Sequence, residues 1–573
     1  MTELMRDTVF GHFVRLITKQ RYFQYAEERD PKLWKQYLDR KQTRNMALHG
    51  NTNGPSADDN SEKEIINTPS DVSSDARVGG EEHEQQLSST ITGQVIDPEK
   101  GRDVTMVTWF GDNDPENPIN WSTFKKVFVT FEICLLTFSV YIGSAIYTAG
   151  IEDVIQTFGV SQVKATLGLT LFVAGYGLGP MIWAPMSEIP QIGRNPVYIG
   201  TLIVFVIFQV PTALAVNFAM LLCFRFLTGF IGSPVLATGG ASISDMFEPK
   251  KRAYAIGIWG IAAVCGPVLG PLVGGFAAQA KGWTWTIWEL MWLCGFSLIL
   301  FIFFLPETSS TNILYRRTRR LRKLTGIQTL RCQPEIMAEH MTGKEVVLIA
   351  LIRPITLNLE PIVFLLNLYI ALIYGLLYIW FESFPIVFVG IYGFNLGQEG
   401  LAFVGILVGA ILVIPPFFLY LYKVVEPQFN EKGELQPEKR LPPAFVGAFC
   451  IPICLFWFGW SAHAGPNLSW IMPIIGSSFF SFGTFLLFNS VLNYLPDAYP
   501  EYAASVLAGN DFMRSSFGAG FPLFAAAMYN NLGVAWASST LGFLSIAFIP
   551  IPFVLYKYGA QIRKKSKNAR QDI

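Results

Sequence analysis

Charged residues are scarce in this chain. Asp, Glu, Lys and Arg together make up 15% of its 573 residues, whereas an ordinary soluble protein carries about 25%. Many stretches of about 20 residues contain one charge or none, and a helix of that length crosses a bilayer. The shortage excludes a soluble globular protein and predicts an all-α polytopic membrane protein. The net charge of zero says little, because the charges lie in tails and loops.

Groupings that would support catalysis or metal binding are also missing. The seven cysteines form neither a metal-ligand pattern nor a disulfide framework, and no cluster of His, Asp or Ser falls within the apolar stretches. The glycine-rich ATP-binding motif that ends in Lys-Ser or Lys-Thr does not occur either. We therefore expect no enzyme, metal site, cofactor or nucleic-acid partner, and a proton gradient as the energy source.

Twelve apolar stretches are long enough to span a membrane, six on each side of a basic segment. If the spans alternate, the Lys and Arg residues of the loops gather on one side, which predicts cytosolic termini. We expect no cleavable signal peptide, because the N-terminus lacks a clean apolar core. The expected spans are residues 126–148, 164–184, 197–217, 219–243, 255–279, 284–305, 358–380, 400–422, 442–462, 468–494, 505–529 and 533–556.

The N-terminal tail, residues 1–104, divides by composition into two parts. In its first 48 or so residues Val9, Phe13 and Ile17 recur at helical spacing among basic residues. This amphipathic stretch either lies on an anionic membrane face or docks on the protein. The remainder is rich in Asn, Ser, Asp, Glu and Gly, cannot bury a core and is expected to be disordered.

The rest of the chain is expected to form two bundles joined by a linker. The bundles are residues 105–305 and 358–556, the basic cytosolic linker is residues 306–357, and a basic cytosolic tail follows at residues 557–573. The run LYRRTRRLRKLTG in the linker either contacts anionic lipid headgroups or is a solvated segment that obeys the charge rule.

The two halves echo each other. Asp245 (in DMFEP) and Asp497 (in DAYPE) both follow an even-numbered span, 252 residues apart, and the same offset takes Gly266 to Gly518. Parallel repeats of six spans with a substrate site between them are a recurring transporter plan, in which the halves rock against each other.

Several motifs carry a resemblance to a known family. They are WFGDNDPENPINW before span one, GPMIWAPMSEIPQIGRNPVY between spans two and three, RFLTGFIGS in span four, GPVLGPLVGG in span five and LPET after span six. Together they resemble the major facilitator superfamily, specifically its fungal 12-spanner drug:proton antiporters, the multidrug resistance permeases of yeasts and moulds. The resemblance covers about residue 105 to the C-terminus.

This resemblance implies a fold and a function. The fold would be the major facilitator fold, with 12 transmembrane helices in two pseudo-symmetric six-helix bundles. The function would be proton-coupled efflux of small, mostly apolar toxicants, such as azole antifungals and fungicides, by a monomer in the fungal plasma membrane, with drugs, protons and membrane lipid as partners. The alternative is export of a self-made secondary metabolite or a polyamine by the same mechanism.

A conformational gate is expected at the cytosolic ends of spans two to four. Glu188 and Arg194 lie at a helix junction where an acid and a base can latch two helices in one state, and Asp245 is assigned to the same gate. The spacing from Glu188 to Arg194 is longer than is usual in the superfamily, and Asn195 replaces a second basic residue. Because no clear copy of this motif lies between spans eight and nine, only one such gate can be assigned.

Three residues within the spans are candidates for proton coupling. Arg225 must be paired, hydrogen-bonded or in contact with water; the resemblance implies that it tunes a nearby carboxylate, and the alternative is a packing role through helix-end carbonyls. Glu132 is the deepest acid in the sequence. Asp511 lies three residues before Arg514, where a structural ion pair is the default.

The remaining candidates are small residues of span five and a set of aromatic and amide residues. The small residues recur about every four residues, which permits close helix contact and a kink. The resemblance ties them to antiport. They are Gly266, Pro267, Gly270, Pro271, Gly274 and Gly275.

The aromatic and amide residues are expected, by the family's architecture, to line a substrate cavity between the halves. They are Tyr141, Tyr147, Asn367, Tyr369, Tyr374, Phe485 and Asn489.

Overall fold

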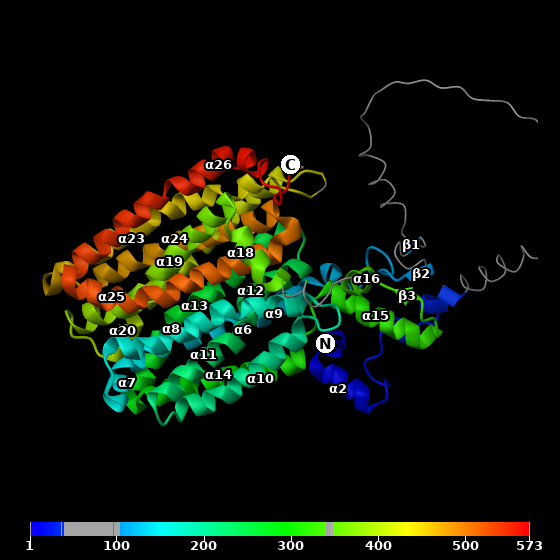
Figure 1. Ribbon diagram of the computed structural model, residues 1–573, viewed down its shortest axis with the longest axis horizontal. Helices are drawn as coiled ribbons and strands as arrows, with labels where there is room; N and C mark the ends of the chain where they lie inside the picture. Colours follow the sequence, from blue (N-terminus) through cyan, green and yellow to red (C-terminus); the bar gives the residue numbers. More distant parts are fainter. Residues whose placement is uncertain are drawn as a thin grey trace, which may run out of the picture.

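The computed structural model describes residues 2–35, 37–38, 95–96, 103–339, 345, 348–431 and 433–571. Two groups of long helices lie side by side, the first half of the chain in cyan and green and the second half in yellow to red (Figure 1). Both ends of the chain lie toward the same end of these bundles (Figure 1).

The first bundle contains six spans, and prolines divide some of them. Pro180 and Pro234 each occupy the first position of a helix, where the missing N–H of proline is tolerated but continuation of the preceding helix is not. Spans two and four are therefore each built from two helices. The helices are α6 (Thr123–Ala145), α7 (Ile151–Phe158), α8 (Gln162–Leu178), α9 (Pro180–Glu188), α10 (Arg194–Ala213), α11 (Phe218–Gly232), α12 (Pro234–Met246), α13 (Pro249–Lys281) and α14 (Trp283–Phe304).

The second bundle follows the same plan. Its helices are α19 (Pro361–Phe384), η4 (Pro385–Val389), α20 (Leu396–Ala402), α21 (Val404–Leu412), α22 (Ile414–Tyr420), η5 (Leu421–Val425), η6 (Glu426–Gln428), η7 (Pro437–Arg440), α23 (Pro442–His463), η8 (Gly465–Asn467), α24 (Ile471–Ala498), η9 (Pro500–Tyr502), α25 (Ala503–Phe548) and α26 (Pro550–Arg563). The all-α polytopic fold is confirmed.

The twelve-span count also agrees with the structure. Within the described residues, eleven helices are long and apolar enough to cross a membrane, and the last of them, Ser505–Arg563, is 59 residues long. It contains two spans that turn at Gly533, whose φ of 73° lies in the left-handed region that favours glycine. Across this turn the hydroxyls of Tyr529 and Ser538 are 3.1 Å apart.

A small sheet and a linker helix lie at the end of the bundles where the chain termini are found (Figure 1). Strand β2 (Asp103–Met106) pairs antiparallel with β1 (Val95–Ile96) and parallel with β3 (Leu330–Arg331). The sheet contradicts the expectation of disorder for residues 95–96 and 103–104; the other residues between 50 and 104 lie outside the described part. The linker also forms α15 (Ser310–Thr325), α16 (Gln333–Glu339), η3 (Leu348–Ile352) and α18 (Arg353–Asn358).

The start of the N-terminal tail is docked on the protein. It forms α1 (Thr2–Arg6), α2 (Val9–Ile17) and α3 (Ala26–Arg29). The rings of Phe10 in α2 and Phe303 in α14 are 4.9 Å apart, and the backbone N–H of Glu307 donates to the carbonyl of Asp7. Phe13, Leu16 and Ile17 of α2 remain exposed.

Part of the basic run in the linker forms buried ion pairs instead of meeting solvent or lipid. Arg317 of α15 is fully buried and contacts Asp114 through two hydrogen bonds of 2.5 and 3.0 Å. Burial raises the pKa of Asp114, but the hydrogen bonds and charge of Arg317 outweigh this effect and hold that pKa below its usual value. Glu116 accepts from Arg320 at 3.0 Å. The segment before span one is thereby fastened to the linker.

Candidate functional site

A cavity of about 270 Å³ lies between the two halves of the chain. Its walls come from α9, α12 and α13 of the first half and from α24 and α25 of the second. Glu188 and Pro500 on its lining are exposed, so the cavity opens to solvent at the end of the bundles that carries the linker. The charged residues of the lining are Glu188, Arg194, Asp245, Arg252, Asp497, Asp511 and Arg514.

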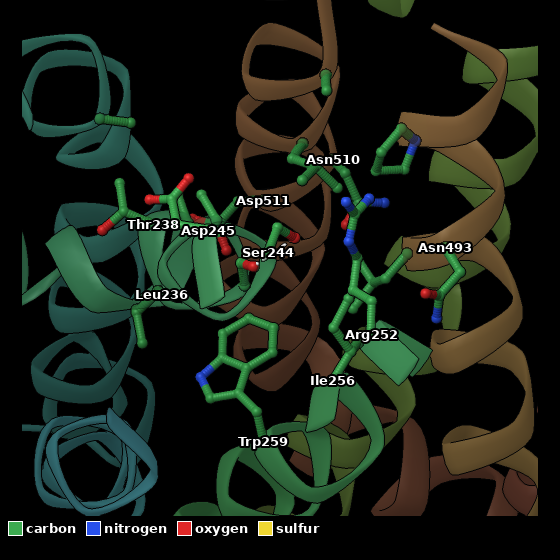
Figure 2. A pocket seen from close by; sticks show the side chains of 18 of the residues that line it. Leu236, Thr238, Ser244, Asp245, Arg252, Ile256, Trp259, Asn493, Asn510 and Asp511 are labelled. Carbon is green, nitrogen blue, oxygen red and sulfur yellow. Dashed lines mark hydrogen bonds between the residues drawn. The ribbon is translucent and has the colours of Figure 1, made fainter. Parts of the chain in front are cut away.

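The side chains in the cavity come from both halves. Figure 2 shows Arg252 and Trp259 of α13 projecting between Asp245 of α12 on one side and Asn493 of α24 on the other. The indole N–H of Trp259 donates to Thr137 Oγ1 of α6 at 2.8 Å, which fixes the ring. The cavity therefore joins a polar, charged rim to an aromatic wall.

Asp511 and Arg514 of α25 form an ion pair at the inner wall of this cavity. Arg514 Nε donates to Asp511 Oδ1 at 2.9 Å, and the two side chains are 2% and 5% exposed. Asp511 Oδ2 is buried and has no hydrogen-bond partner among the described residues. A buried carboxylate oxygen without a partner is costly. Arg514 Nη2 also donates to the hydroxyl of Tyr141, at 2.9 Å.

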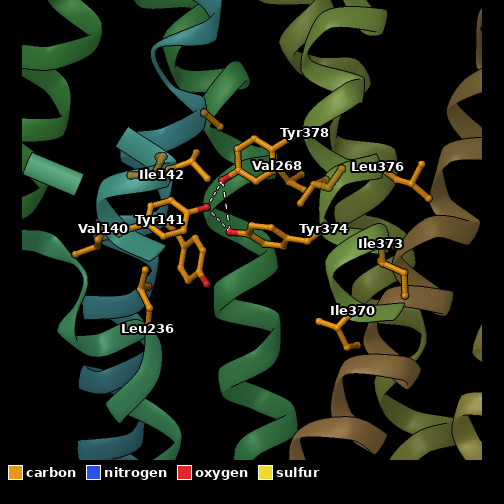
Figure 3. Packing of buried hydrophobic residues seen from close by; sticks show 14 of the residues in the cluster. Val140, Tyr141, Ile142, Leu236, Val268, Ile370, Ile373, Tyr374, Leu376 and Tyr378 are labelled. Atoms are coloured by element: carbon orange, nitrogen blue, oxygen red, sulfur yellow. Dashed lines mark hydrogen bonds between the residues drawn. The ribbon is translucent and has the colours of Figure 1, made fainter. Parts of the chain in front are cut away.

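A buried tyrosine cluster, formed by Tyr141, Tyr176, Tyr374 and Tyr378, connects the two halves beyond that ion pair. The hydroxyl of Tyr176 in α8 lies 2.5 Å from that of Tyr374 and 2.8 Å from that of Tyr378, both in α19. Tyr378 donates to Ser144 Oγ of α6 at 2.9 Å. Figure 3 shows the hydroxyls of Tyr374 and Tyr378 pointing toward each other among apolar side chains. The cluster closes the path between the halves, and Arg514 touches it through Tyr141.

Arg194 pairs with Asp245, one of the two acids assigned to the predicted gate. Arg194 Nε, at the start of α10, donates to Asp245 Oδ2 at 2.9 Å. Glu307, from the LPET motif, accepts from the backbone N–H groups of Arg194 and Asn195 at 3.1 and 3.2 Å. Among the described residues no hydrogen bond joins Arg194 to Glu188, which faces the cavity instead. Proline and isoleucine residues lengthen the loop between Glu188 and Arg194, and Arg194 forms its ion pair with Asp245 instead.

A matching arginine–aspartate pair lies in the second half, where the sequence showed no clear copy of the gate motif. Arg440 Nε, at the end of η7, donates to Asp497 Oδ2 of α24 at 2.9 Å, the same atoms and distance as in the Arg194–Asp245 pair. The Asp245–Asp497 echo in the sequence pointed to it. The sequence did not predict the pair, because Arg440 lies in a segment that does not resemble the first-half motif.

The structure gives Arg225 no carboxylate partner among the described residues. Its Nε donates to the carbonyl of Gly168 at 3.0 Å and its Nη1 to that of Gly143 at 2.9 Å. The guanidinium also lies over the rings of Tyr147 and Phe172, at 4.7 and 4.4 Å. These contacts hold α6, α8 and α11 together within the first half.

Glu132 is buried within the first bundle, away from the cavity. It is fully covered, and neither carboxylate oxygen has a hydrogen-bond partner among the described residues. Two turns along α6 on the same helix face, Ser139 contacts Ser297 of α14 at 2.9 Å, so this face packs inside the first half. Glu132 does not line the cavity, and of the two acids proposed for proton coupling only Asp511 does.

The small residues of span five act in packing. A Cβ atom at Gly266 would meet the Cβ of Tyr141 at 2.6 Å, and one at Gly270 would meet that of Ala145 at 2.8 Å, so α13 lies against the α6 backbone within the first half. Gly275 is different, because its Cβ would meet the carbonyl oxygen of Leu396 in the second half at 2.4 Å. Pro267 and Pro271 lie inside the helix and Gly274 packs against Ile146.

The outer ends of the spans are closed between the halves. Gly400 of α20 lies so close to α13 that its Cβ would be 2.6 Å from the Leu272 Cα atom. Thr170 of α8 donates to the carbonyl of Ala519 at 2.9 Å, and Glu382 of α19 accepts from Thr166 at 3.3 Å. Since the cavity lies at the opposite end, the structure represents a conformation that is open at the linker end and closed at the other.

The seven residues predicted to contact the substrate are buried, with at most 6% of each exposed. None lines the cavity. Tyr141 and Tyr374 belong to the tyrosine cluster beside Arg514, and their contact with substrate stays a prediction for a conformation in which the cluster has separated. The others are Tyr147 beneath Arg225, Asn367 bonded to Asn510, Tyr369 beside Phe548, Phe485 beside Phe417 and Asn489, whose Oδ1 lies 3.6 Å from where a Cβ of Gly257 would be.

Comparison with known proteins identifies close relatives. The family model of the Major Facilitator Superfamily matches residues 133–522. The chain is 47% identical to Transporter mfs1 of Schizosaccharomyces pombe, over 81% of this chain and 88% of that protein. It is 43% identical to Fluconazole resistance protein 1 of Saccharomyces cerevisiae (84% and 88% covered) and 41% to the Cycloheximide resistance protein of Candida maltosa (89% and 94%). The xylose transporter XylE of E. coli, at 16% identity and a TM-score of 0.51 over 76% of this chain and 99% of that one, shares the fold.

Proposed function

The chain belongs to the major facilitator superfamily, within it to the fungal drug:proton antiporters, and on this premise we propose that it exports small, mostly apolar toxicants in exchange for protons by alternating access. Relatives named for resistance to fluconazole and cycloheximide support drugs of those kinds as substrates. The drive is the proton gradient, and no cofactor takes part.

One observation carries the coupling proposal: a buried acid lies in the cavity between the halves and is linked to the cluster that closes it. Asp511 pairs with Arg514, and Arg514 holds Tyr141. A proton on Asp511 removes its charge and weakens its hold on Arg514. Arg514 then changes its interaction with the tyrosine cluster, and the free energy of contact between the halves changes with it.

The cycle follows from the two closures. In the inward-facing conformation a drug enters the cavity from the cytosolic end, and the outer contacts between α13 and α20 exclude it from outside. Rocking of the halves opens those contacts and brings the two gate pairs, Arg194–Asp245 and Arg440–Asp497, toward each other. A proton from the outside reaches Asp511 in the outward-facing conformation and is released inside after the return.

The proposal includes a location and an orientation. The protein is placed in the plasma membrane as a monomer, with both termini in the cytosol, in contact with lipid. The position of both chain ends at the end of the bundles that carries the basic linker (Figure 1) supports this orientation through the positive-inside rule.

Purified protein in liposomes tests the coupling. Labelled fluconazole should accumulate in inside-out liposomes whose lumen is acidic, because proton exit through the protein then drives drug entry. A protonophore that collapses the gradient should abolish accumulation. Accumulation that persists without a gradient would defeat the antiport proposal, and transport of xylose in place of the drug would defeat the substrate class.

A further inference from the structure

A second cavity, of about 250 Å³, lies outside the bundles between the N-terminal tail and the linker helix. One wall is formed by α15 and consists of Arg316, Arg319, Arg320, Lys323 and Leu324. These residues recur at helical spacing and therefore lie on one face of the helix. The other wall comes from α2 and the turn before α3, with His12, Arg15, Gln20, Tyr25 and Glu28. We call this cavity the basic pocket.

Ion pairs within the protein fix the shape of the basic pocket. Arg15 donates two hydrogen bonds to Glu28, of 2.9 and 2.6 Å. Arg320 is held by Glu27 at 2.5 Å and by Glu116 at 3.0 Å, and its guanidinium stacks 3.5 Å from the ring centre of Tyr25. The walls of the basic pocket are therefore held in place by contacts within the protein and do not need a ligand to form.

Two of the remaining cations of the basic pocket have no ion pair within the described residues, and the third has only a long one. Arg319 and Lys323 are exposed and have no ion pair or hydrogen bond there. Arg316 shares a hydrogen bond of 2.7 Å with His12 Nε2 and lies 3.8 Å from Glu307. Burial and the charge of Arg316 lower the pKa of His12 to about 4, so His12 is neutral and Arg316 keeps a positive charge to offer. This charge excess fits a phosphorylated anion.

The apolar side of α2 indicates where that anion comes from. Phe13, Leu16 and Ile17 are 59%, 78% and 64% exposed, which is unusual for large apolar residues of one helix face. This exposed face continues a bilayer-facing stripe of α14 that runs through Trp292, Phe296, Ile299 and Phe303 at helical spacing, because α2 packs on Phe303 through Phe10. Helix α2 thus extends the lipid-facing surface beyond the end of the span.

We infer that α2 lies in the inner leaflet of the membrane and that the basic pocket holds the phosphorylated headgroup of an anionic phospholipid. The apolar face of α2 enters the acyl region, and Arg316, Arg319 and Lys323 bind the phosphate groups. The tail, the linker and the first bundle then form one lipid-binding unit. This inference does not depend on what the cavity between the halves transports.

Binding of short-chain phosphatidylinositol 4-phosphate to the purified full-length protein tests the inference. Each basic residue near a membrane anion contributes about 1 kcal/mol, so Arg319→Gln together with Lys323→Gln should weaken binding by roughly 30-fold at the tenfold-per-1.4 kcal/mol conversion. The matched control is Lys557→Gln with Lys564→Gln, which removes the same charge from an exposed position of α26 and from the exposed residue that follows this helix. It should leave affinity within about twofold, because exposed surface charges contribute little.

Further measurements distinguish a membrane phospholipid from a soluble inositol phosphate as the ligand. Phe13→Ser with Leu16→Ser should weaken binding of the lipid but not of soluble inositol 1,4-bisphosphate, because only the lipid has acyl chains. Equal affinity for the lipid and the soluble headgroup would overturn the membrane assignment. Equal loss in the α15 and α26 variants would overturn the pocket, since it would reduce the effect to general surface charge. Arg316→Gln provides a second pocket variant, and its failure to weaken binding would likewise contradict the site.

Discussion

Gly400→Ala should shift this protein from its inward-facing toward its outward-facing conformation. Gly400 belongs to the second half, and a methyl group on it would lie 2.6 Å from both the Pro271 carbonyl oxygen and the Leu272 Cα atom in the first half. Both obstacles are backbone atoms, which cannot move aside as a flexible side chain can. The contact exists only while the outer ends are closed, so the clash raises the free energy of that conformation alone.

The size of the shift follows from overpacking. Extra methyl groups in close-packed contacts cost about 1–3 kcal/mol, which corresponds to a change of roughly 5- to 150-fold in the equilibrium between conformations. Alanine is also the better helix former by about 1 kcal/mol. That gain is the same in both conformations and cancels from the difference.

The control is Gly266→Ala. Its methyl group would meet Tyr141 Cβ at 2.6 Å and Ile142 N at 2.9 Å, an equally severe clash, but both partners belong to the same half as Gly266. Because α6 and α13 move as one body, this variant should lower the unfolding temperature without favouring either conformation.

Spin labels at the outer surface measure the outcome. Thr157 and Ser469 are exposed, one in each half, and Cys223→Ser removes the exposed native cysteine. Pulsed electron resonance between labelled cysteines at these two positions should show a larger population of long distances in Gly400→Ala and not in Gly266→Ala. An unchanged distribution in Gly400→Ala, or the same shift in both variants, would refute the division into moving halves and outer closure.

Three further predictions concern the charged groups. Asp511→Asn keeps the shape of the carboxylate but not its titration, so drug accumulation driven by a pH gradient in liposomes should be lost while drug binding, measured by tryptophan quenching, persists; gradient-driven accumulation in this variant would rule out Asp511 as the carrier. Arg194→Gln and Arg440→Gln should reduce the transport rate to a similar extent, because each removes the same 2.9 Å contact to an aspartate; an effect confined to Arg194 would contradict two gates. Asp114→Asn should lower the unfolding temperature, because a buried ion pair broken on one side costs about 3–5 kcal/mol, and the pH dependence gives a second readout. The pKa of folded Asp114 is depressed, so its contribution is present above the unfolded pKa of about 3.9 and is lost as pH falls through the folded value; equal acid sensitivity of wild type and variant would contradict the assignment.

The spans, the six-and-six division and the family could be predicted from the sequence, because hydrophobic length and loop charge are local properties of the chain. The ion pairs could not. Arg194 was paired in prediction with Glu188, six residues away, but in the structure it is bound to Asp245, because only the packing of α10 against α12 decides which acid is within reach. Arg440 escaped notice because no local motif surrounds it. Its partner Asp497 was recognisable by the repeat.

The basic run of the linker, LYRRTRRLRKLTG, also has contacts that the sequence alone could not predict. In sequence, Arg317 and Arg319 are equivalent members of one cluster. The helical period of α15 separates them, since Arg317 points toward Asp114 and is fully buried while Arg319 points into the basic pocket and stays exposed. Charge counting places the whole run in the cytosol but cannot divide it into residues that stabilise the fold and residues that bind a ligand.

The closed outer end and the open cavity end differ in their chemistry, and this difference bears on how protons can drive the transporter. The outer closure rests on close backbone contact at glycines such as Gly275 and Gly400, together with the hydrogen bond from Thr166 to Glu382. Several titratable groups also lie in the cavity and at its rim, among them Asp511, Asp245 and Asp497. We expect a proton on Asp511 to act on the conformational equilibrium from the cavity side, through Arg514 and Tyr141. The outer contacts then open or close as a consequence. Each half is stiff, so a rotation that changes the contacts at the cavity end also changes those at the outer end.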